Sequence, residues 1–461
     1  MPNSHRSFHR SLVLLLLLTA LPLAAFVGAI GWTPAAAQED SLPMRNYLLG
    51  QSAQGRPIEV FQFGDGQRKL VVVGNTHGAP EGNTYRLTLA LIDYLKANPQ
   101  VVPPDLRLFL IPTVNPDGIA LGWRFDAFGV DLNRNMNTAL DACPENDWRV
   151  TVQGARGVVS DTGGPYADSQ VESRLVRGFL LDAAGAIFLH SNAGLVFPAS
   201  CEHAPSNALA QTYAGAAGYV YSRFWDAYTI TGGMHDWAGG LGIAAITPEL
   251  VTGDQIEFQQ NLAGLLAVLE QSEALLPLPE PGEIAGLVVP PSIYRYWRAF
   301  GGMERFGAPL GPAVATPDGV TQVFGNVRIT MRYDRLDSVE FVQPDPIGVR
   351  AAVDLAYGGA ATLAPVAPDA TARYFDATGH TLKEAFLDFW QRNGGAPVFG
   401  LPLSEEFPAI TADGRQRIVQ YFERAVLAYY PEDGGVRLEP LGLREAVLET
   451  MTDPAVQFTA R

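Results

Sequence analysis

The segment Lys69-Leu70-Val71-Val72-Val73-Gly74-Asn75-Thr76-His77 carries a continuous apolar run into a turn and a histidine. A short valine-rich run of this kind is typical of a strand that is buried on both faces. Three similar runs lie further along the chain, at 106–112, 186–190 and 244–247, with a helix-patterned segment at 82–97. Because such strands alternate with longer amphipathic segments, the sequence predicts an α/β layer architecture for this part of the chain.

Polar side chains capable of chemistry follow each of these strands. They are Thr76-His77, Asn115, His190-Ser191 and Glu249. In open α/β sheets the ligand crevice lies outside the carboxyl ends of the strands. We therefore expect these residues to converge on one site.

The composition of the whole chain excludes several classes of protein. Its 461 residues predict two or three domains, and 47% hydrophobic against 17% charged residues exclude a disordered polymer. The 32 Lys and Arg against 48 Asp and Glu give a formal charge of −16. Since sequence-independent binding to nucleic acid needs Lys and Arg against the phosphates, we expect no nucleic-acid partner.

The first 37 residues have the pattern of a secretory signal. Arg6 and Arg10 precede an apolar run at 12–31, and Pro34-Ala35-Ala36-Ala37 supplies a small-residue cleavage site. Cleavage after Ala37 would remove both arginines and no acid, which changes the formal charge from −16 to −18. The alternative is an uncleaved N-terminal membrane anchor, because about 20 apolar residues span a bilayer. Both interpretations predict a secreted or cell-envelope protein.

The chain has two cysteines, Cys143 and Cys201. An oxidising compartment outside the cell permits a disulfide between them. Two separately buried thiols are the alternative.

A proline-rich stretch at 276–291 separates two regions whose sequence patterns differ. It begins Leu276-Pro277-Leu278-Pro279-Glu280-Pro281-Gly282, where proline removes backbone donors and favours a stiff linker. The sequence therefore predicts a linker between a domain at 38–275 and a second region at 292–461.

The region beyond the linker repeats itself. Trp297 and Gly307 recur 93 residues later as Trp390 and Gly400. Each tryptophan lies in a similar helix-patterned segment that is followed by a Gly-Gly turn. Two copies of one small α+β unit are predicted, at about 292–345 and 382–445. They resemble the LGFP-type repeats of exported bacterial proteins, which implies a possible cell-envelope ligand. The two tryptophans also suit ordinary core anchors.

Two of the five histidines outside the predicted signal end predicted strands, namely His77 and His190. Glu81 follows His77 on the same turn. Two imidazoles and one carboxylate form the ligand set of a catalytic zinc, which leaves a position open to water. A histidine and a glutamate four residues apart also suit a solvated helix start.

A series of motifs in a fixed order resembles the zinc metallocarboxypeptidase family (carboxypeptidase A-like) over roughly residues 47–275. The motifs are Asn115-Pro116-Asp117-Gly118, Trp123-Arg124, Gly129 through Asn135, Gly163-Gly164-Pro165 with Ser169 and Glu172, Leu189-His190-Ser191, Tyr228 with Gly232-Gly233, and Thr247-Pro248-Glu249-Leu250. The resemblance implies an α/β fold with a mixed-sheet, zinc carboxypeptidase-like catalytic domain.

The resemblance also implies a catalytic centre. His77, Glu81 and His190 match the ligands of one Zn²⁺ per chain. Asp131 matches the carboxylate that orients the first histidine. Glu249 matches the general base.

Further residues match groups that contact the substrate. Arg124 would stabilise the developing oxyanion. Asn133 and Arg134 would clamp the terminal carboxylate, since arginine binds a carboxylate through two parallel hydrogen bonds. Tyr228 would close over the bound peptide, and His235 would form the floor of the side-chain pocket.

Two departures from the family pattern affect these assignments. Three residues separate His77 from Glu81 where the family has two, so a bulge is expected to absorb the extra residue. His235 stands where family members that prefer apolar ends have an aliphatic residue and those that prefer basic ends have an aspartate. A protonated His235 would suit an acidic or polar side chain.

The sequence thus predicts an exported zinc carboxypeptidase, a metalloprotease and hydrolase whose partners are the C termini of peptides or proteins. One alternative is a peptidoglycan stem-peptide endopeptidase or amidase of the same family. Another is an inactive peptide-binding pseudoenzyme that has lost the metal. The sequence gives no basis for an oligomeric state.

Overall fold

The structure is a computed structural model that describes residues 44–154, 157–357 and 363–452. The predicted signal at 1–37 lies outside the described residues. Among the helices that are described, none is long and apolar enough to cross a membrane.

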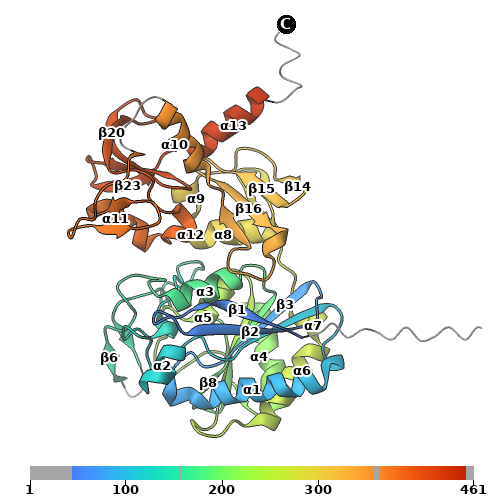
Figure 1. Ribbon diagram of the computed structural model, residues 1–461. Helices are drawn as coiled ribbons and strands as arrows, with labels where there is room; N and C mark the ends of the chain where they lie inside the picture. Colours follow the sequence, from blue (N-terminus) through green and yellow to red (C-terminus); the bar gives the residue numbers. More distant parts are fainter. Residues whose placement is uncertain (1–43, 155–156, 358–362, 453–461) are drawn as a thin grey trace, which may run out of the picture. The chain divides into compact units, whose positions relative to one another are not determined.

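A mixed sheet forms the centre of the region before the proline-rich stretch, which is the predicted catalytic domain (Figure 1). In the described part of the chain it has nine strands, in the order β1-β2-β4-β3-β7-β11-β9-β10, with β8 paired to β11. Strands β4, β3, β7 and β11 are mutually parallel, whereas β1 pairs with β2, β2 with β4, and β9 with β11 in antiparallel fashion. Strand β10 is parallel to β9. The strands are β1 (Arg45–Gln51), β2 (Pro57–Phe63), β3 (Arg68–Val73), β4 (Leu106–Ile111), β7 (Gly185–Phe188), β8 (His190–Ser191), β9 (Leu195–Pro198), β10 (Val220–Tyr221) and β11 (Ala244–Leu250).

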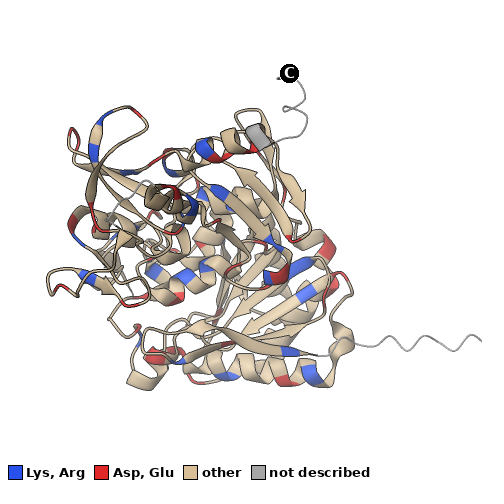
Figure 2. Cartoon of the chain, turned by 45° about the horizontal axis from the view of Figure 1, so that its top comes forward, with Lys and Arg blue, Asp and Glu red and all other residues tan. Residues whose placement is uncertain are grey.

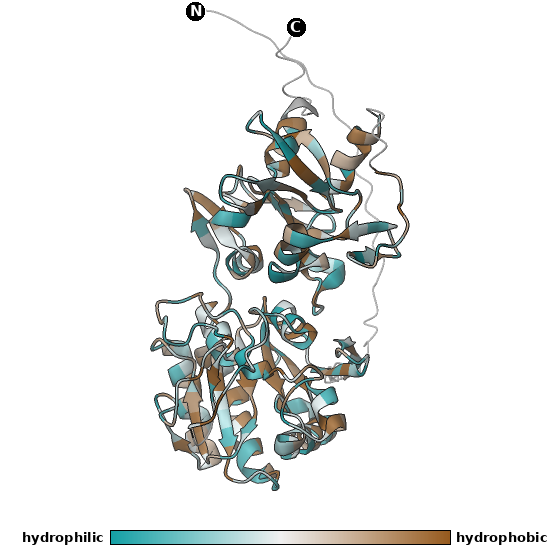
Figure 3. Ribbon diagram, turned by 90° about the vertical axis from the view of Figure 1, so that its left-hand side faces the viewer, coloured by the Kyte–Doolittle hydropathy of each residue, from teal (hydrophilic) through white to brown (hydrophobic). Residues whose placement is uncertain are grey.

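Helices cover both faces of this sheet, which confirms the predicted α/β class. Alternate residues of β3 point to opposite sides, so Leu70 and Val72 join one core and Val71 and Val73 join another. The first core includes α1 (Gly82–Ala97), α4 (Ala204–Ala217) and α6 (Phe258–Glu270), and the second includes α3 (Val171–Phe179) and α5 (Met234–Gly240). The central strands are accordingly rich in hydrophobic residues (Figure 3).

Shorter elements build the loops around the sheet. They are η1 (Ala79–Glu81), η2 (Pro99–Val101), α2 (Pro116–Leu121), η3 (Leu132–Arg134), the pair β5 (Val152–Gln153) and β6 (Val159–Ser160), and α7 (Ser272–Leu275). Lys and Arg are interspersed with Asp and Glu along the elements (Figure 2).

The C-terminal region contains two segments whose α-helices and strands follow the same order, and the first segment has in addition the 3₁₀ turn η5. The first runs through β12 (Gly282–Ile284), β13 (Leu287–Val289), α8 (Pro291–Phe300), α9 (Gly302–Phe306), β14 (Val314–Thr316), β15 (Gly319–Val323), β16 (Arg328–Arg332), η5 (Tyr333–Arg335), β17 (Val342–Pro344) and α10 (Ile347–Tyr357). The second runs through β18 (Arg373–Phe375), β19 (His380–Leu382), α11 (Glu384–Arg392), α12 (Ala396–Phe399), β20 (Phe407–Ile410), β21 (Gln416–Tyr421), β22 (Val426–Tyr430), β23 (Gly435–Leu438) and α13 (Leu441–Thr452).

Matching contacts accompany this matching order. Trp297 Nε1 donates to the Gly307 carbonyl at 2.9 Å, and Trp390 Nε1 donates to the Gly400 carbonyl at 2.9 Å. Each tryptophan therefore ties its helix to the turn that precedes the four-stranded sheet of its own segment.

The boundaries of these segments differ from the predicted ones. Strands β12 and β13 occupy the second half of the predicted linker at 276–291, so irregular chain is confined to 276–281. Each segment begins with a two-stranded hairpin that starts before the predicted first residue of the segment. Each ends with a helix that extends past the predicted last residue. Strands of three residues are too short for a periodic pattern to reveal them.

Candidate active site

Three side chains of types that can bind a metal meet beyond the carboxyl ends of β3 and β7. His77 Nδ1 lies 2.6 Å from Glu81 Oε1 and 3.1 Å from His190 Nδ1, and His190 Nδ1 lies 2.9 Å from Glu81 Oε2. All three side chains are buried. The structure thus brings together the three residues in which the sequence predicted a metal site.

The extra residue between His77 and Glu81 is absorbed by a tight turn and not by a strand bulge. Gly78 has a φ of 50°, and the next three residues form the 3₁₀ turn η1, which carries Glu81 back toward His77. A Cβ on Gly78 would lie 2.1 Å from the Trp123 carbonyl oxygen. Glycine is therefore required here both for the positive φ and for the close approach of the two loops.

Asn75 holds this turn in place, a role that the sequence analysis missed. Its Nδ2 donates to the carbonyls of Gly78 at 2.7 Å and Glu81 at 3.0 Å, and its own φ is 35°. Asparagine tolerates that conformation and bonds to nearby backbone. The Gly74-Asn75 pair directly after a strand was the available signal.

Asn115 joins the first metal loop to the loop that carries Arg124. Its Oδ1 caps α2 by accepting from the Gly118 amide at 2.8 Å, while its Nδ2 donates to the carbonyls of Thr76 at 3.0 Å and Phe125 at 3.1 Å. The sequence placed Asn115 at the site, and the structure makes it a support for the loops.

Asp131 and Arg124 lie directly behind the metal-ligating residues. Asp131 Oδ1 is 3.1 Å from His77 Nε2, and Arg124 Nε donates to Asp131 Oδ2 at 3.0 Å. Burial alone would raise the pKa of the Asp131 carboxyl, but Arg124 and His77 hold that pKa well below its usual value. Asp131 and Arg124, whose Nη2 lies 2.8 Å from the same His77 Nε2, together hold this nitrogen on the far side of the ring, which leaves His77 Nδ1 beside Glu81 and His190.

Glu249 lies on β11 beside the second histidine, because Glu249 and His190 are paired positions in the parallel ladder of β11 and β8. Burial raises the pKa of Glu249 to about 7, and the nearby charge of His190 acts in the opposite direction. A carboxyl whose pKa is near neutrality suits proton transfer at physiological pH.

Asn133 and Arg134 are both buried, and both lie in η3. Arg134 Nη1 donates to the Asn133 carbonyl at 2.7 Å, and its Nε has no hydrogen-bond partner within the described residues. Asn133 Oδ1 accepts from the Met234 amide at 2.9 Å, and its Nδ2 is 3.4 Å from His190 Nε2. Arg134 therefore keeps donors for a ligand, whereas Asn133 already has protein contacts.

Tyr228 and His235 line a cavity of about 700 Å³ beside these residues. The guanidinium of Arg134 lies 5.7 Å from the centre of the Tyr228 ring. Burial lowers the pKa of His235, so the neutral form predominates near neutral pH. The structure thus argues against the protonated His235 that would have suited an acidic substrate side chain.

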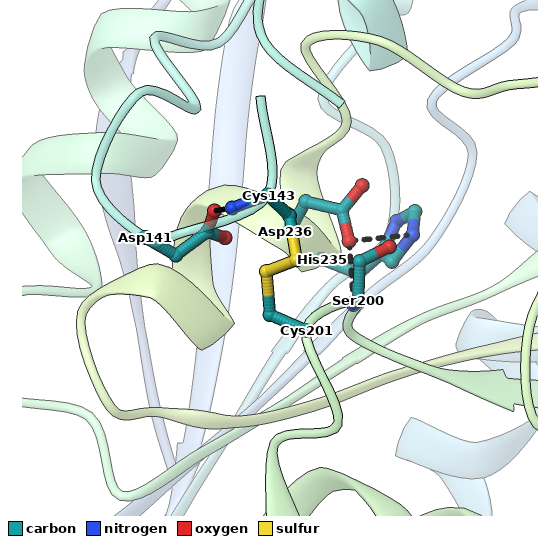
Figure 4. Close-up of a disulfide and its surroundings, with 6 residues drawn as sticks. All are labelled: Asp141, Cys143, Ser200, Cys201, His235 and Asp236. Atoms are coloured by element: carbon teal, nitrogen blue, oxygen red, sulfur yellow. Dashed lines mark hydrogen bonds and ion pairs between the residues drawn. A yellow bond between two sulfur atoms is a disulfide. The ribbon is translucent and has the colours of Figure 1, made fainter. Parts of the chain in front are cut away.

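A disulfide joins Cys143 to Cys201 at the edge of the same cavity, with a Cα–Cα separation of 5.8 Å (Figure 4). The sequence left open whether these two cysteines pair.

Comparison with known proteins identifies the family. The family model described as zinc carboxypeptidase matches residues 30–271, which is more than half of the chain. The chain belongs to the zinc carboxypeptidase family. The resemblance found in the motifs is confirmed for this domain, whereas the resemblance of the C-terminal segments to LGFP-type repeats remains a prediction.

Individual relatives of this zinc carboxypeptidase-family protein are distant. Carboxypeptidase SOL1 of Arabidopsis thaliana is 33% identical over 103 residues, which cover 20% of this chain and 21% of the plant protein. Murein peptide amidase A of Escherichia coli K12 is 26% identical over 219 residues, or 46% of this chain and 84% of the amidase. The solved structure of bovine thrombin-activatable fibrinolysis inhibitor matches 50% of this chain and 90% of its own, with 20% identity and a TM-score of 0.42.

The donor set fits the zinc on which the family depends. Two imidazole nitrogens and one carboxylate converge, all three residues are buried, and all candidate ligand atoms lie within 4.8 Å of one another. Zinc prefers these donors in catalytic sites and leaves a fourth position to water or substrate. His77, Glu81 and His190 are thus the residues that would hold the ion.

Proposed function

We propose that this chain is an exported zinc-dependent carboxypeptidase that hydrolyses the C-terminal bond of peptides. The observation that carries the proposal is the convergence of His77, Glu81 and His190 beside one carboxylate, Glu249, and one arginine with unused donors, Arg134. Recognition of a free carboxylate distinguishes an exopeptidase from an endopeptidase, and Arg134 is the group that would supply it.

Proton transfer falls to Glu249. Zinc bound by the three ligands would acidify a water molecule and polarise the scissile carbonyl. Glu249 would accept the proton of the attacking water and return it to the leaving amine. A pKa of about 7 lets the same carboxyl act as base and then as acid.

Arginine side chains would stabilise charge on the substrate. Arg124 would donate to the oxyanion that develops at the scissile carbonyl, and its side chain is held by Asp131 and remains one-third exposed. Arg134, with Asn133, would hold the terminal carboxylate. Tyr228 would cover the bound residue.

The test combines metal content with a scan of free and amidated peptides. Purified full-length chain should retain about one zinc, cleave single residues from free C termini and lose activity with a chelator. Arg134→Ala should raise KM strongly for free C termini and much less for amidated ones. Equal losses on both would argue against a carboxylate clamp. Less than about half an equivalent of zinc after purification with zinc present would favour an inactive peptide-binding protein.

A second candidate is an amidase or endopeptidase that acts on peptidoglycan stem peptides. It is supported by the match to murein peptide amidase A, which extends over 84% of that protein. To separate the two candidates, the protein is incubated with stem peptides that contain internal γ-linked bonds and, in parallel, with linear peptides. The mass of the first product shows which bond is cleaved. Release of an internal fragment without C-terminal trimming would favour the amidase.

We also propose that the two C-terminal segments bind a cell-envelope ligand and that the first 37 residues direct export. The duplicated fold and the small-residue cleavage site in the sequence support this part of the proposal. Mass spectrometry of the exported protein should find Gln38 at the N terminus; an intact N terminus in the membrane fraction would instead indicate an anchor.

A further inference from the structure

A second cavity, of about 420 Å³, lies where the catalytic domain meets both C-terminal segments, and we call it the junction cavity. Its walls come from residues 137–140, 167–168 and α3 of the catalytic domain, from the α8–α9 turn of the first segment, and from the end of α11 in the second. It shares no lining residue with the cavity beside Tyr228. Since a water molecule occupies only about 30 Å³, the junction cavity has room for more than an inorganic ion.

Positive charge dominates the lining of the junction cavity. Four arginines line it, against one carboxylate, and these residues are Arg177, Arg298, Arg305, Arg392 and Asp168. The chain as a whole has 32 Lys and Arg against 48 Asp and Glu, so this local excess of cations opposes the overall balance. A recess that is lined by one sign of charge attracts ligands of the opposite sign.

Two of these arginines form no ion pair within the described residues. Arg298 Nη2 donates to the Leu140 carbonyl at 2.5 Å. Arg305 donates to the Phe300 carbonyl and to Asn393 Oδ1. Both guanidinium groups therefore bind neutral oxygens, and their charge is not compensated. A guanidinium has five N–H donors, so each of the two keeps donors for a ligand.

The other two arginines each have one carboxylate partner. Arg177 Nη1 donates to Asp168 Oδ2 at 2.5 Å, and Arg392 Nε donates to the exposed Asp388 at 2.6 Å. Burial and the charge of Arg177 lower the pKa of Arg305 to about 10, as expected where cations lie close together in a partly desolvated place. A net excess of positive charge thus remains at Arg298 and Arg305.

The duplication indicates that the repeated fold does not require these two arginines. At the offset of 93 residues, Arg298 corresponds to Gln391 and Arg305 to Val398. The second segment forms the same order of helices and strands with a neutral and an apolar residue at these positions. If the two charges served the fold of the unit, we would expect them in both copies. They occur only in the copy whose turn lines the junction cavity.

The rest of the lining suits the body of an organic ligand. Asn137 forms one hydrogen bond within the described residues, from its backbone amide to Asp168 Oδ1 at 3.2 Å, so its side-chain amide is free to bond a hydroxyl. The remaining lining residues, apart from Asn393, are small or apolar, namely Ala139, Leu140, Ala167, Trp297, Ala299, Phe300, Gly301 and Gly302. Such residues provide space and an apolar wall for a carbon ring.

We infer that the junction cavity binds an acidic saccharide, that is, a sugar ring that carries a carboxylate or a phosphate. Arg298 and Arg305 would donate to the oxyanion, because the planar guanidinium matches carboxylate and phosphate geometry. Asn137 would bond to a ring hydroxyl. The inference does not depend on the peptidase reaction, and it rests on the proposed function only in taking this saccharide as the cell-envelope ligand of the C-terminal segments.

Binding of small sugars to the full-length chain tests this assignment without turnover. Glucuronate and glucose 6-phosphate share the ring of glucose and add a carboxylate or a phosphate. Isothermal calorimetry should find at least one acidic sugar bound about tenfold more tightly than glucose, the scale of one charge-assisted hydrogen bond, and added salt should weaken that binding. The tighter of the two acidic sugars distinguishes a carboxylate ligand from a phosphate ligand. Equal binding of glucose, inorganic phosphate that binds as tightly as the acidic sugars, or no binding of either acidic sugar would overturn the inference.

Paired variants locate the effect. Arg298→Gln with Arg305→Val gives the first segment the residues of the second at these positions and should remove the preference for an acidic sugar. The matched control is Arg335→Gln with Arg415→Val, which removes the same charge from two exposed positions. A preference that survives the first pair, or falls equally in the control pair, would contradict the assignment.

A single variant keeps the test decisive if the double variant does not fold. Arg298→Gln alone, at a half-buried position, should weaken binding of the acidic sugar by about threefold or more, and unchanged binding would overturn the inference. If the acidic sugars bind but isolated cell envelopes do not retain the chain, the proposed envelope association fails and the assignment of the junction cavity stands.

Discussion

At the scale of single residues, Glu249 combines two properties that a general base needs. It is adjacent to His190 in the β8–β11 ladder, and burial raises its pKa to about 7. It is also absent from the convergent ligand set of His77, Glu81 and His190. Its removal should therefore affect the reaction and leave the metal in place.

Glu249→Gln should bind zinc as the wild type does and reduce kcat by about a hundredfold or more, the usual contribution of a general acid–base group. Atomic absorption on the purified variant and initial rates on a free C-terminal peptide check both halves of this expectation. Full activity would mean that another group transfers the proton. Loss of metal would mean that Glu249 belongs to the ligand set.

The Gly78 turn predicts a second result. Gly78→Ala should reduce zinc occupancy and activity, because a methyl group 2.1 Å from the Trp123 carbonyl must displace one of the two loops. Gly55→Ala is the matched control, since Gly55 also has a positive φ, of 76°, but its Cβ would meet nothing within 4 Å. If both variants lose metal to a similar extent, the loss comes from the strained backbone and not from the contact with the Trp123 carbonyl.

The metal-ligand candidates and the carboxylate of Asp131 behind His77 could be predicted from the sequence, and the residues that hold the first metal loop through its backbone could not. His77 and His190 each end an apolar strand, so topology alone brings them together. Asn75 and Gly78 act through backbone conformation and bonds to main-chain carbonyls, and no spacing rule identifies such contacts. The unfamiliar His77-to-Glu81 interval led us to expect a bulge, whereas a positive φ at one glycine solves the same problem.

At the scale of secondary-structure elements, α3 begins with a buried acid, Glu172, that forms no ion pair within the described residues. Glu172 Oε1 accepts from the Ala53 amide at 2.8 Å, and Oε2 has no hydrogen-bond partner within the described residues. Burial raises the pKa of Glu172 to about 7, and the nearby Asp126 and Asp117 carboxylates add to the effect.

This acid predicts a pH-dependent stability. Between about pH 4.5 and 7 the folded state holds the Glu172 proton and the unfolded state releases it, so this group's contribution to stability falls as pH rises. Glu172→Gln should remove that slope. The variant should gain stability relative to wild type from pH 5 to pH 8, by up to about 3 kcal/mol. Urea unfolding at both pH values measures the difference, and a constant difference would contradict the assignment.

The disulfide between Cys143 and Cys201 leads to a second prediction at this scale, which concerns the free energy of unfolding. It closes a segment of 58 residues that includes α3, β7, β8 and β9. Cys143→Ser with Cys201→Ser should lower the free energy of unfolding by about 4 kcal/mol, according to the loop-closure model. Thermal unfolding with and without reductant checks this: the reductant should lower the midpoint of the wild type and leave the double variant unchanged.

At the scale of the whole molecule, the C-terminal segments are less separable from the catalytic domain than the proline-rich stretch predicts. Asp337, beyond β16, forms ion pairs with Arg107 at 2.9 Å and Lys69 at 3.7 Å, both on central strands of the catalytic sheet. Apolar residues of α8 belong to the same core as Val71 and Val73. The sequence shows where the prolines lie, but it does not show contacts of this kind between residues that are far apart in the chain.

Arg295 on α8 carries the last prediction, because the duplication supplies its control. Arg295 is buried and donates to the carbonyls of Leu241, Leu181, Ala183 and Gly242. The corresponding position 93 residues later is Asp388 on α11, an exposed residue paired with Arg392.

Arg295→Ala would leave four carbonyls without their donor and should destabilise the protein by about 3 kcal/mol or more. Asp388→Ala loses one exposed ion pair and should cost less than about 1 kcal/mol. Differential calorimetry on the full chain compares them. If Arg295→Ala unfolds like the wild type, these four hydrogen bonds contribute little to the link between the two regions, and the ion pairs of Asp337 and the shared core must supply it. If it unfolds early and loses catalytic-domain structure, the repeated segments are part of the fold that supports the active site.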